Sequence, residues 1–141
     1  MKKAHSLLAA FVLTLVAGAA SAFAQDITVK AHVPFDFIVS ASALSAGDYT
    51  FSKLSETLWT IRNENTGRAV TAVASRFGSN EDKREAELVF KKIGSNYFLS
   101  EVHRMGDTTA LPPSKTERRM EREVARNGSK PESVYVLASA R

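Results

Sequence analysis

Residues 27–39 read ITVKAHVPFDFIV and decide the fold of this chain, because apolar side chains occupy every second position along the stretch. A period of two is typical of a β-strand with one buried face and one face in water. Pro34 cannot donate a hydrogen bond to a neighbouring strand, so we expect a bend there and two strand segments that share one inward face. The predicted inward side chains are Ile27, Val29, Ala31, Val33, Phe35, Phe37 and Val39.

Further short strands are predicted downstream, where the same alternation recurs between segments rich in turn formers. Residues 41–48, 78–85 and 105–113 have the composition of a turn and two loops. Short strands at such regular spacing predict a mainly β fold, namely an antiparallel β-sandwich or small barrel of about seven to eight strands with one C-terminal helix. Tyr49 and Trp59 are expected to join Phe35 and Phe37 in its core. The strands expected after residue 48 are 49–52, 58–61, 69–75, 87–93, 97–104 and 133–138.

One helix is predicted near residues 115–126, which contain good helix formers and no glycine or proline. Ser114 and Glu117 have the spacing of a capping box, and Asn127-Gly128 supplies a stop signal. Basic residues recur along it in steps of three and four, so they form one cationic stripe. Met120 and Val124 form a short apolar stripe suited to packing on a sheet. The stripe, a candidate anion-contact surface, consists of Lys115, Arg118, Arg119, Arg122 and Arg126.

This cationic stripe has two interpretations. The first is a solvated helix in which Glu117, Glu121 and Glu123 form ion pairs with the neighbouring basic residues, each worth a few tenths of a kcal/mol. The second is contact with an anionic partner such as lipid headgroups, lipopolysaccharide or an acidic polymer. The interleaved glutamates favour the first interpretation.

The motif V-P-F-D-F-I-V at residues 33–39, followed by L-S-A-G-D-Y at 44–49, resembles a group of small exported bacterial proteins of unknown function. The sequence motif of these proteins is V-P-F-x-F-x-V followed by L-P-A-G-x-Y. Residues 114–118 also resemble a later Ser-Lys-x-Glu-Arg segment of the same proteins. This chain has Ser45 where that pattern has proline, which implies a less rigid turn. The resemblance implies an exported β-rich domain and brings no activity, substrate or cofactor with it.

The N-terminus predicts export. Residues 1–24 combine a cationic start, an uncharged apolar run at 7–20 and an A-x-A cleavage site at 22–24, the order of parts in a secretory signal peptide. The apolar run is too short for a convincing transmembrane span, so no membrane-spanning segment is expected after cleavage. The expected domain organisation is a signal peptide at 1–24 and a single β-rich domain at 25–141. The expected location is the periplasm or the extracellular space.

Composition excludes several classes of function. The chain has no cysteine, so disulfides, cysteine nucleophiles and thiolate metal sites are excluded. Its formal net charge of +4 includes Lys2 and Lys3 of the signal peptide, and without them 17 basic residues face 15 acidic ones, a net charge of +2. A charge so close to zero gives no case for a nucleic-acid partner.

No pattern of residues predicts catalysis. The chain lacks a G-x-S-x-G elbow, a glycine-rich phosphate loop and an H-E-x-x-H motif. His32, His103 and Asp36 could ligate a metal only if their strands were neighbours, and surface histidines are the simpler interpretation. We therefore expect no catalytic residues, no cofactor and no metal site.

Three functions follow from these observations. The first is an exported non-catalytic binding or structural domain of the cell envelope or extracellular space, whose partner is unknown except for the candidate anionic component at the helix. The second is a carrier of a small apolar ligand, with a cavity inside the sandwich or barrel. The third is a secreted hydrolase, which the missing motifs disfavour.

Overall fold

The computed structural model describes residues 28–79 and 85–140, so the predicted signal peptide lies outside the described residues. The first strand of the alternating stretch is β1 (Thr28–Val33), in which Val29, Ala31 and Val33 are buried. The ladder stops at Pro34, as predicted for a residue without an amide hydrogen, and resumes as β2 (Phe37–Val39).

The segment after β2 differs from the prediction. Residues 41–48 were expected to form only a turn, but they contain β3 (Ser42–Leu44), which pairs with β2 in a tight antiparallel hairpin. Ser40 permits this reversal with a positive φ of 56°. Leu44, opposite Phe37, is buried, so the hairpin gains an apolar contact that the small-residue composition does not suggest.

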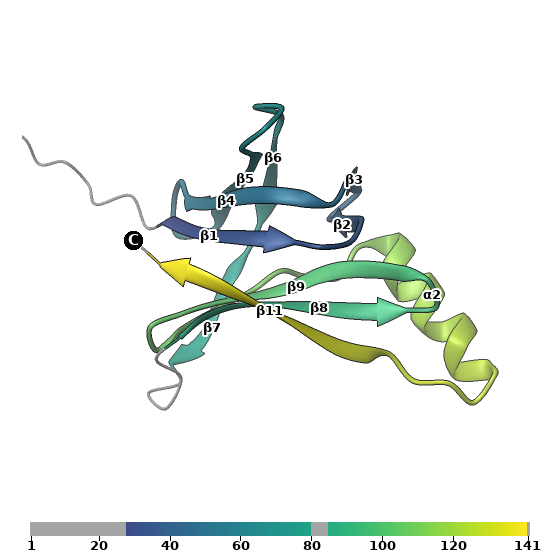
Figure 1. Cartoon of the computed structure of the whole chain (residues 1–141). Coiled ribbons are helices and arrows are strands. Elements are labelled where there is room, and N and C mark those ends of the chain that lie inside the picture. The colour runs from purple at the N-terminus through teal and green to yellow at the C-terminus, as the bar shows by residue number, and fades with distance from the viewer. Residues whose placement is uncertain (1–27, 80–84, 141) are drawn as a thin grey trace, which may run out of the picture.

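The fold is mainly β with one helix in the C-terminal region (Figure 1). The described residues contain eleven strand segments, more than the seven to eight expected. The sheet is mixed rather than purely antiparallel, because β2 runs parallel to β9 at Ile38 and Phe98. The remaining strands are β4 (Gly47–Lys53), β5 (Leu58–Asn63), β6 (Ala69–Val73), β7 (Ser75–Ser79), β8 (Ala86–Ile93), β9 (Asn96–Arg104), β10 (Asp107–Ala110) and β11 (Glu132–Ala140).

The sheet is nearly closed into a barrel. Its strand order is β3-β2-β9-β8-β11-β1-β4-β5-β6. The chain continues from β6 past Ala74 into β7, which pairs with β10, and β10 pairs with β9. The chain thereby leads from the β6 end of the sheet back to β9, which nearly closes the barrel. Strands β1 and β11 pair only through Val29 with Ala140 and Lys30 with Ser139.

Two of the strand segments that close the sheet, β7 and β10, lie partly or wholly in sequence that predicted loops. Residues 105–113 were expected to be a loop, and they contain β10 because β9 and β7 supply ladder partners on both of its edges. Thr108 and Thr109 are buried there. Short polar strands of this kind carry too little apolar alternation to be recognised from sequence.

The core contains most of the predicted aromatic residues. Phe37, Tyr49 and Trp59 are buried, and the rings of Phe37 and Tyr49 meet edge to face at 5.0 Å. Phe35 is only half-buried, which corrects its assignment to the inner core. Its ring stacks on Tyr97 at 4.0 Å at the margin of the core, since the break at Pro34 ends the strict alternation.

The helix, α2 (Lys115–Arg126), begins and ends where the sequence predicts. Ser114 Oγ accepts the Glu117 amide proton at 3.1 Å, and the Glu117 carboxylate accepts the Ser114 amide proton at 3.3 Å. Figure 1 shows α2 on one side of the molecule, where it contacts β8. No helix in the part of the chain that the structure describes is long and apolar enough to cross a membrane.

Candidate functional site

The cationic stripe of α2 faces solvent along its whole length. All five of its side chains are exposed, as the sequence predicts. At 100° per residue they fall within an arc of roughly 100°, and at 1.5 Å per residue they extend over about 16 Å. We call this surface the cationic face; it consists of Lys115, Arg118, Arg119, Arg122 and Arg126.

The opposite side of α2 is turned toward the sheet. Glu117, at one end of this side, is only 5% exposed, and Met120 and Val124 are half-buried. The contact of α2 with β8 gives this side its partner. The helix therefore uses its apolar residues to dock on its own sheet and presents its charges outward.

A single lysine of β8 binds two glutamates of α2. Lys91 Nζ lies 3.2 Å from Glu117 Oε1 and 2.7 Å from Glu121 Oε1. Partial burial alone would lower the pKa of Lys91, but its hydrogen bonds to Glu121 and Glu117 and the attraction of both carboxylates raise that pKa above its usual value. The cation is thus retained between α2 and β8, and it holds both carboxylates on the inner side of the helix.

This arrangement differs from the ion pairing that the sequence favours. The interleaved glutamates were expected to pair with the arginines of the same helix, but within residues 28–79 and 85–140 no ion pair joins a cation of α2 to a glutamate of α2. Glu123 is the one acidic residue of α2 that is exposed. The sequence analysis identified the cations of the helix but not Lys91. In the sequence, Lys91 was marked only as a residue of a predicted strand.

The two histidines within the described residues lie far apart in the strand order. His32 on β1 is exposed, and its Nδ1 is 2.8 Å from Asp48 Oδ1. His103 on β9 is buried, and its Nε2 is 2.5 Å from Glu101 Oε2. Strands β8 and β11 separate β9 from β1, so the neighbouring strands that a shared metal site would require are not formed. Within the described residues no group of three or more metal-ligating side chains is present.

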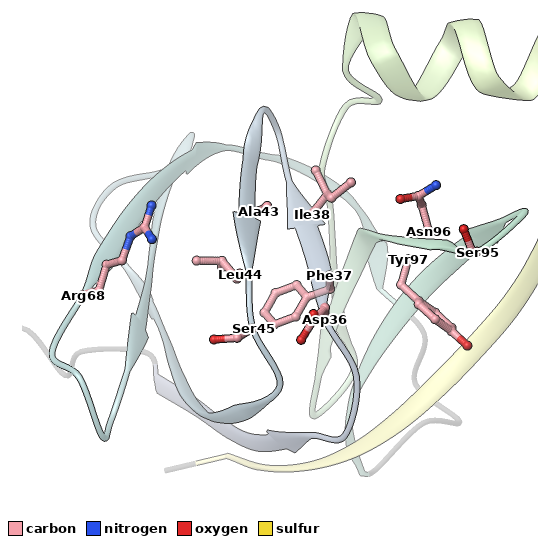
Figure 2. A pocket seen from close by; sticks show the side chains of 10 residues that line it. All are labelled: Asp36, Phe37, Ile38, Ala43, Leu44, Ser45, Arg68, Ser95, Asn96 and Tyr97. Carbon is pink, nitrogen blue, oxygen red and sulfur yellow. The ribbon is translucent and has the colours of Figure 1, made fainter.

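A pocket of about 500 Å³ lies beside the β2–β3 hairpin (Figure 2). Two of its polar groups serve the turn between β3 and β4: Asp36 Oδ1 accepts the Ala46 amide proton at 2.9 Å, and Ser45 O accepts the Tyr49 hydroxyl proton at 2.7 Å. Figure 2 shows Arg68 and Tyr97 on opposite sides of the hairpin, so their polar groups do not converge on one ligand position. The motif residues here form a turn, consistent with a structural role.

Comparison with protein-family models, with curated proteins and with solved structures finds no match. The function is therefore argued from the chemistry of the described residues. Among these, the cationic face is the surface whose chemistry indicates a class of partner, namely an anion. Its five charges are all positive, all face solvent and have no acidic partner on their own helix. The resemblance of residues 33–49 to exported bacterial proteins stays a prediction.

Proposed function

We propose that this protein is an exported, non-catalytic binding domain that attaches to an anionic component of the cell envelope through the cationic face of α2. The observation that carries the proposal is the separation of charges on the helix. Five cations point to solvent, while Lys91 holds Glu117 and Glu121 on the inner side. The outer face thus carries five positive charges against the single negative charge of Glu123, a net charge of +4.

The chemistry of the face suits phosphate-bearing groups. Arginine presents a planar fork of donors that matches phosphate oxygens, and four of the five cations are arginines. Each cation near an anionic lipid surface contributes about 1 kcal/mol of attraction. Because Met120 and Val124 face the sheet, α2 has no apolar side left to insert into a bilayer. Binding at the level of the headgroups, reversible by salt, is the expected mode.

The proposal of export is supported by residues 1–24, whose order of parts is that of a secretory signal peptide. An envelope location would bring the cationic face into contact with phosphate-rich lipid surfaces.

The test is sedimentation of the mature protein with phosphatidylglycerol vesicles, and with phosphatidylcholine vesicles as the neutral comparison. The variant Arg119→Gln/Arg122→Gln/Arg126→Gln removes three charges from the cationic face. At about 1 kcal/mol per charge, the affinity for phosphatidylglycerol vesicles should fall roughly 150-fold. Wild-type binding should weaken steeply as salt rises, because exposed charges are screened beyond about 8 Å at physiological ionic strength.

A matched control removes the same number of exposed charges elsewhere. Lys30→Gln/Arg62→Gln/Arg68→Gln changes β1, β5 and the β5–β6 turn, and all three residues are exposed. This control should keep most of the wild-type affinity and the same melting temperature. Absence of wild-type binding at low salt, or an equal loss in both triple variants, would contradict the proposal.

A further inference from the structure

Two glutamates of α2 lie where they could pair with cations of the same helix. Glu121 lies three residues after Arg118, and Glu123 lies four residues after Arg119. Residues at these spacings are neighbours on a helix surface and form ion pairs there. If both turned outward, the outer side of α2 would carry five positive and two negative charges, a net charge of only +3.

Lys91 prevents this for Glu121, and it shares Glu117 with the capping box at Ser114. The Glu117 side chain is 7% exposed and the Glu121 side chain 30%, and both carboxylates contact Lys91 Nζ. Lys91 lies on β8, thirty residues before Glu121 in the chain, so the pairing exists only when α2 is docked on the sheet. Its own side chain is 31% exposed and is held between the two carboxylates, on the side of α2 away from the cationic face.

We propose that Lys91 is a positioning residue for anion binding: by holding Glu121 on the inner side of α2, where the capping box also keeps Glu117, it keeps the net charge of the outer side of the helix at +4. This inference rests on the proposed function, because it concerns the same surface. It assigns a role in binding to a residue that does not belong to the contact surface. It also predicts that the three glutamates of α2 are not equivalent.

The sharpest test compares Glu121→Gln with Glu123→Gln in the same vesicle assay. Both variants remove one negative charge, and the two positions are only two residues apart. Glu123 is on the outer side, so Glu123→Gln should tighten binding to phosphatidylglycerol vesicles about fivefold, the equivalent of one surface charge. Glu121 is already held by Lys91, so Glu121→Gln should leave the affinity within about twofold of wild type. Equal effects of the two variants would overturn the inference.

A second test removes the lysine. Lys91→Met should weaken vesicle binding about fivefold, because the Glu121 carboxylate then turns outward, whereas Lys91→Arg, which keeps the cation, should bind as wild type does. In the Glu117→Gln/Glu121→Gln background, Lys91→Met should have no effect on binding, because no carboxylate remains to be released. If Lys91→Met alone fails to fold because it leaves carboxylates unpaired, the comparison of Glu121→Gln with Glu123→Gln still tests the inference.

The outcomes separate this inference from the proposed function. If Lys91→Met weakens binding equally in both backgrounds, Lys91 acts through its own charge and the positioning role is wrong. If Lys91→Met binds like wild type while the triple arginine variant has lost binding, the proposed function stands and only the positioning role fails. If wild type does not bind anionic vesicles, the proposed function itself fails.

Discussion

Replacement of Phe37 by alanine tests whether the motif V-P-F-D-F-I-V serves the fold. The Phe37 ring is 1% exposed and meets Tyr49 edge to face at 5.0 Å and Phe90 at 5.4 Å. Loss of a fully buried phenyl group, together with the cavity that it leaves, costs about 3–5 kcal/mol. The two edge-to-face contacts, each worth about 0.5–1.5 kcal/mol beyond burial, place the expected loss in the upper half of that range.

This loss would be a large part of the total stability, which for a domain of this size is about 5–15 kcal/mol. The assay is urea unfolding followed by the fluorescence of Trp59, the one tryptophan of the chain, which is 4% exposed and therefore reports on the core. The urea concentration at the midpoint of unfolding should fall. The dependence of the unfolding free energy on urea concentration should stay constant, as expected when only stability changes.

Phe35→Ala is the matched control for this experiment. It removes the same phenyl group two residues away, and its ring also contacts Phe90, at 5.1 Å. Phe35 is half-buried, so its replacement should cost clearly less free energy of unfolding than that of Phe37. A loss below about 1 kcal/mol for Phe37→Ala, or a loss no greater than that of Phe35→Ala, would refute the assignment of Phe37 to the core.

Two further predictions concern Lys91 and the N-terminus. Because the pKa of Lys91 is raised in the folded protein, its ion pairs contribute their full stability below the unfolded-state value of about 10.4 and lose it as the pH rises through the folded-state value. The stability difference between wild type and Lys91→Met, measured by urea unfolding at a series of pH values, should therefore shrink at alkaline pH and stay constant near neutrality. Mass spectrometry of the exported protein should find Gln25 as its first residue, whereas an intact Met1 on envelope-located protein would contradict the signal-peptide prediction.

Local pattern predicted the elements that carry strong periodicity. The alternation of residues 27–39 predicted β1 and β2, and the capping box at Ser114 predicted the first turn of α2. The short segments β3 and β10 were missed for the opposite reason. Their residues are small or polar, so their strand conformation depends on hydrogen-bonding partners supplied by β2, β7 and β9.

In the candidate site, too, some features were determined by the local sequence and others only by the fold. A helical period brings Arg119, Arg122 and Arg126 to one side of α2 in any environment, so the sequence alone determined where the cations stand. The orientation of Glu121 was not determined locally, because Arg118 lies three residues before it and could pair with it on the helix surface. Glu117 differs, since the capping box at Ser114 holds its carboxylate within the first turn. Only the tertiary structure, by placing Lys91 of β8 under α2, decided that the Glu121 carboxylate turns inward and leaves the cationic face without an acidic partner there. The physical reason is that helix geometry brings together only residues three or four positions apart in the sequence. The ion pair with Lys91 joins residues that are distant in the sequence and meet only when the helix packs on the folded sheet.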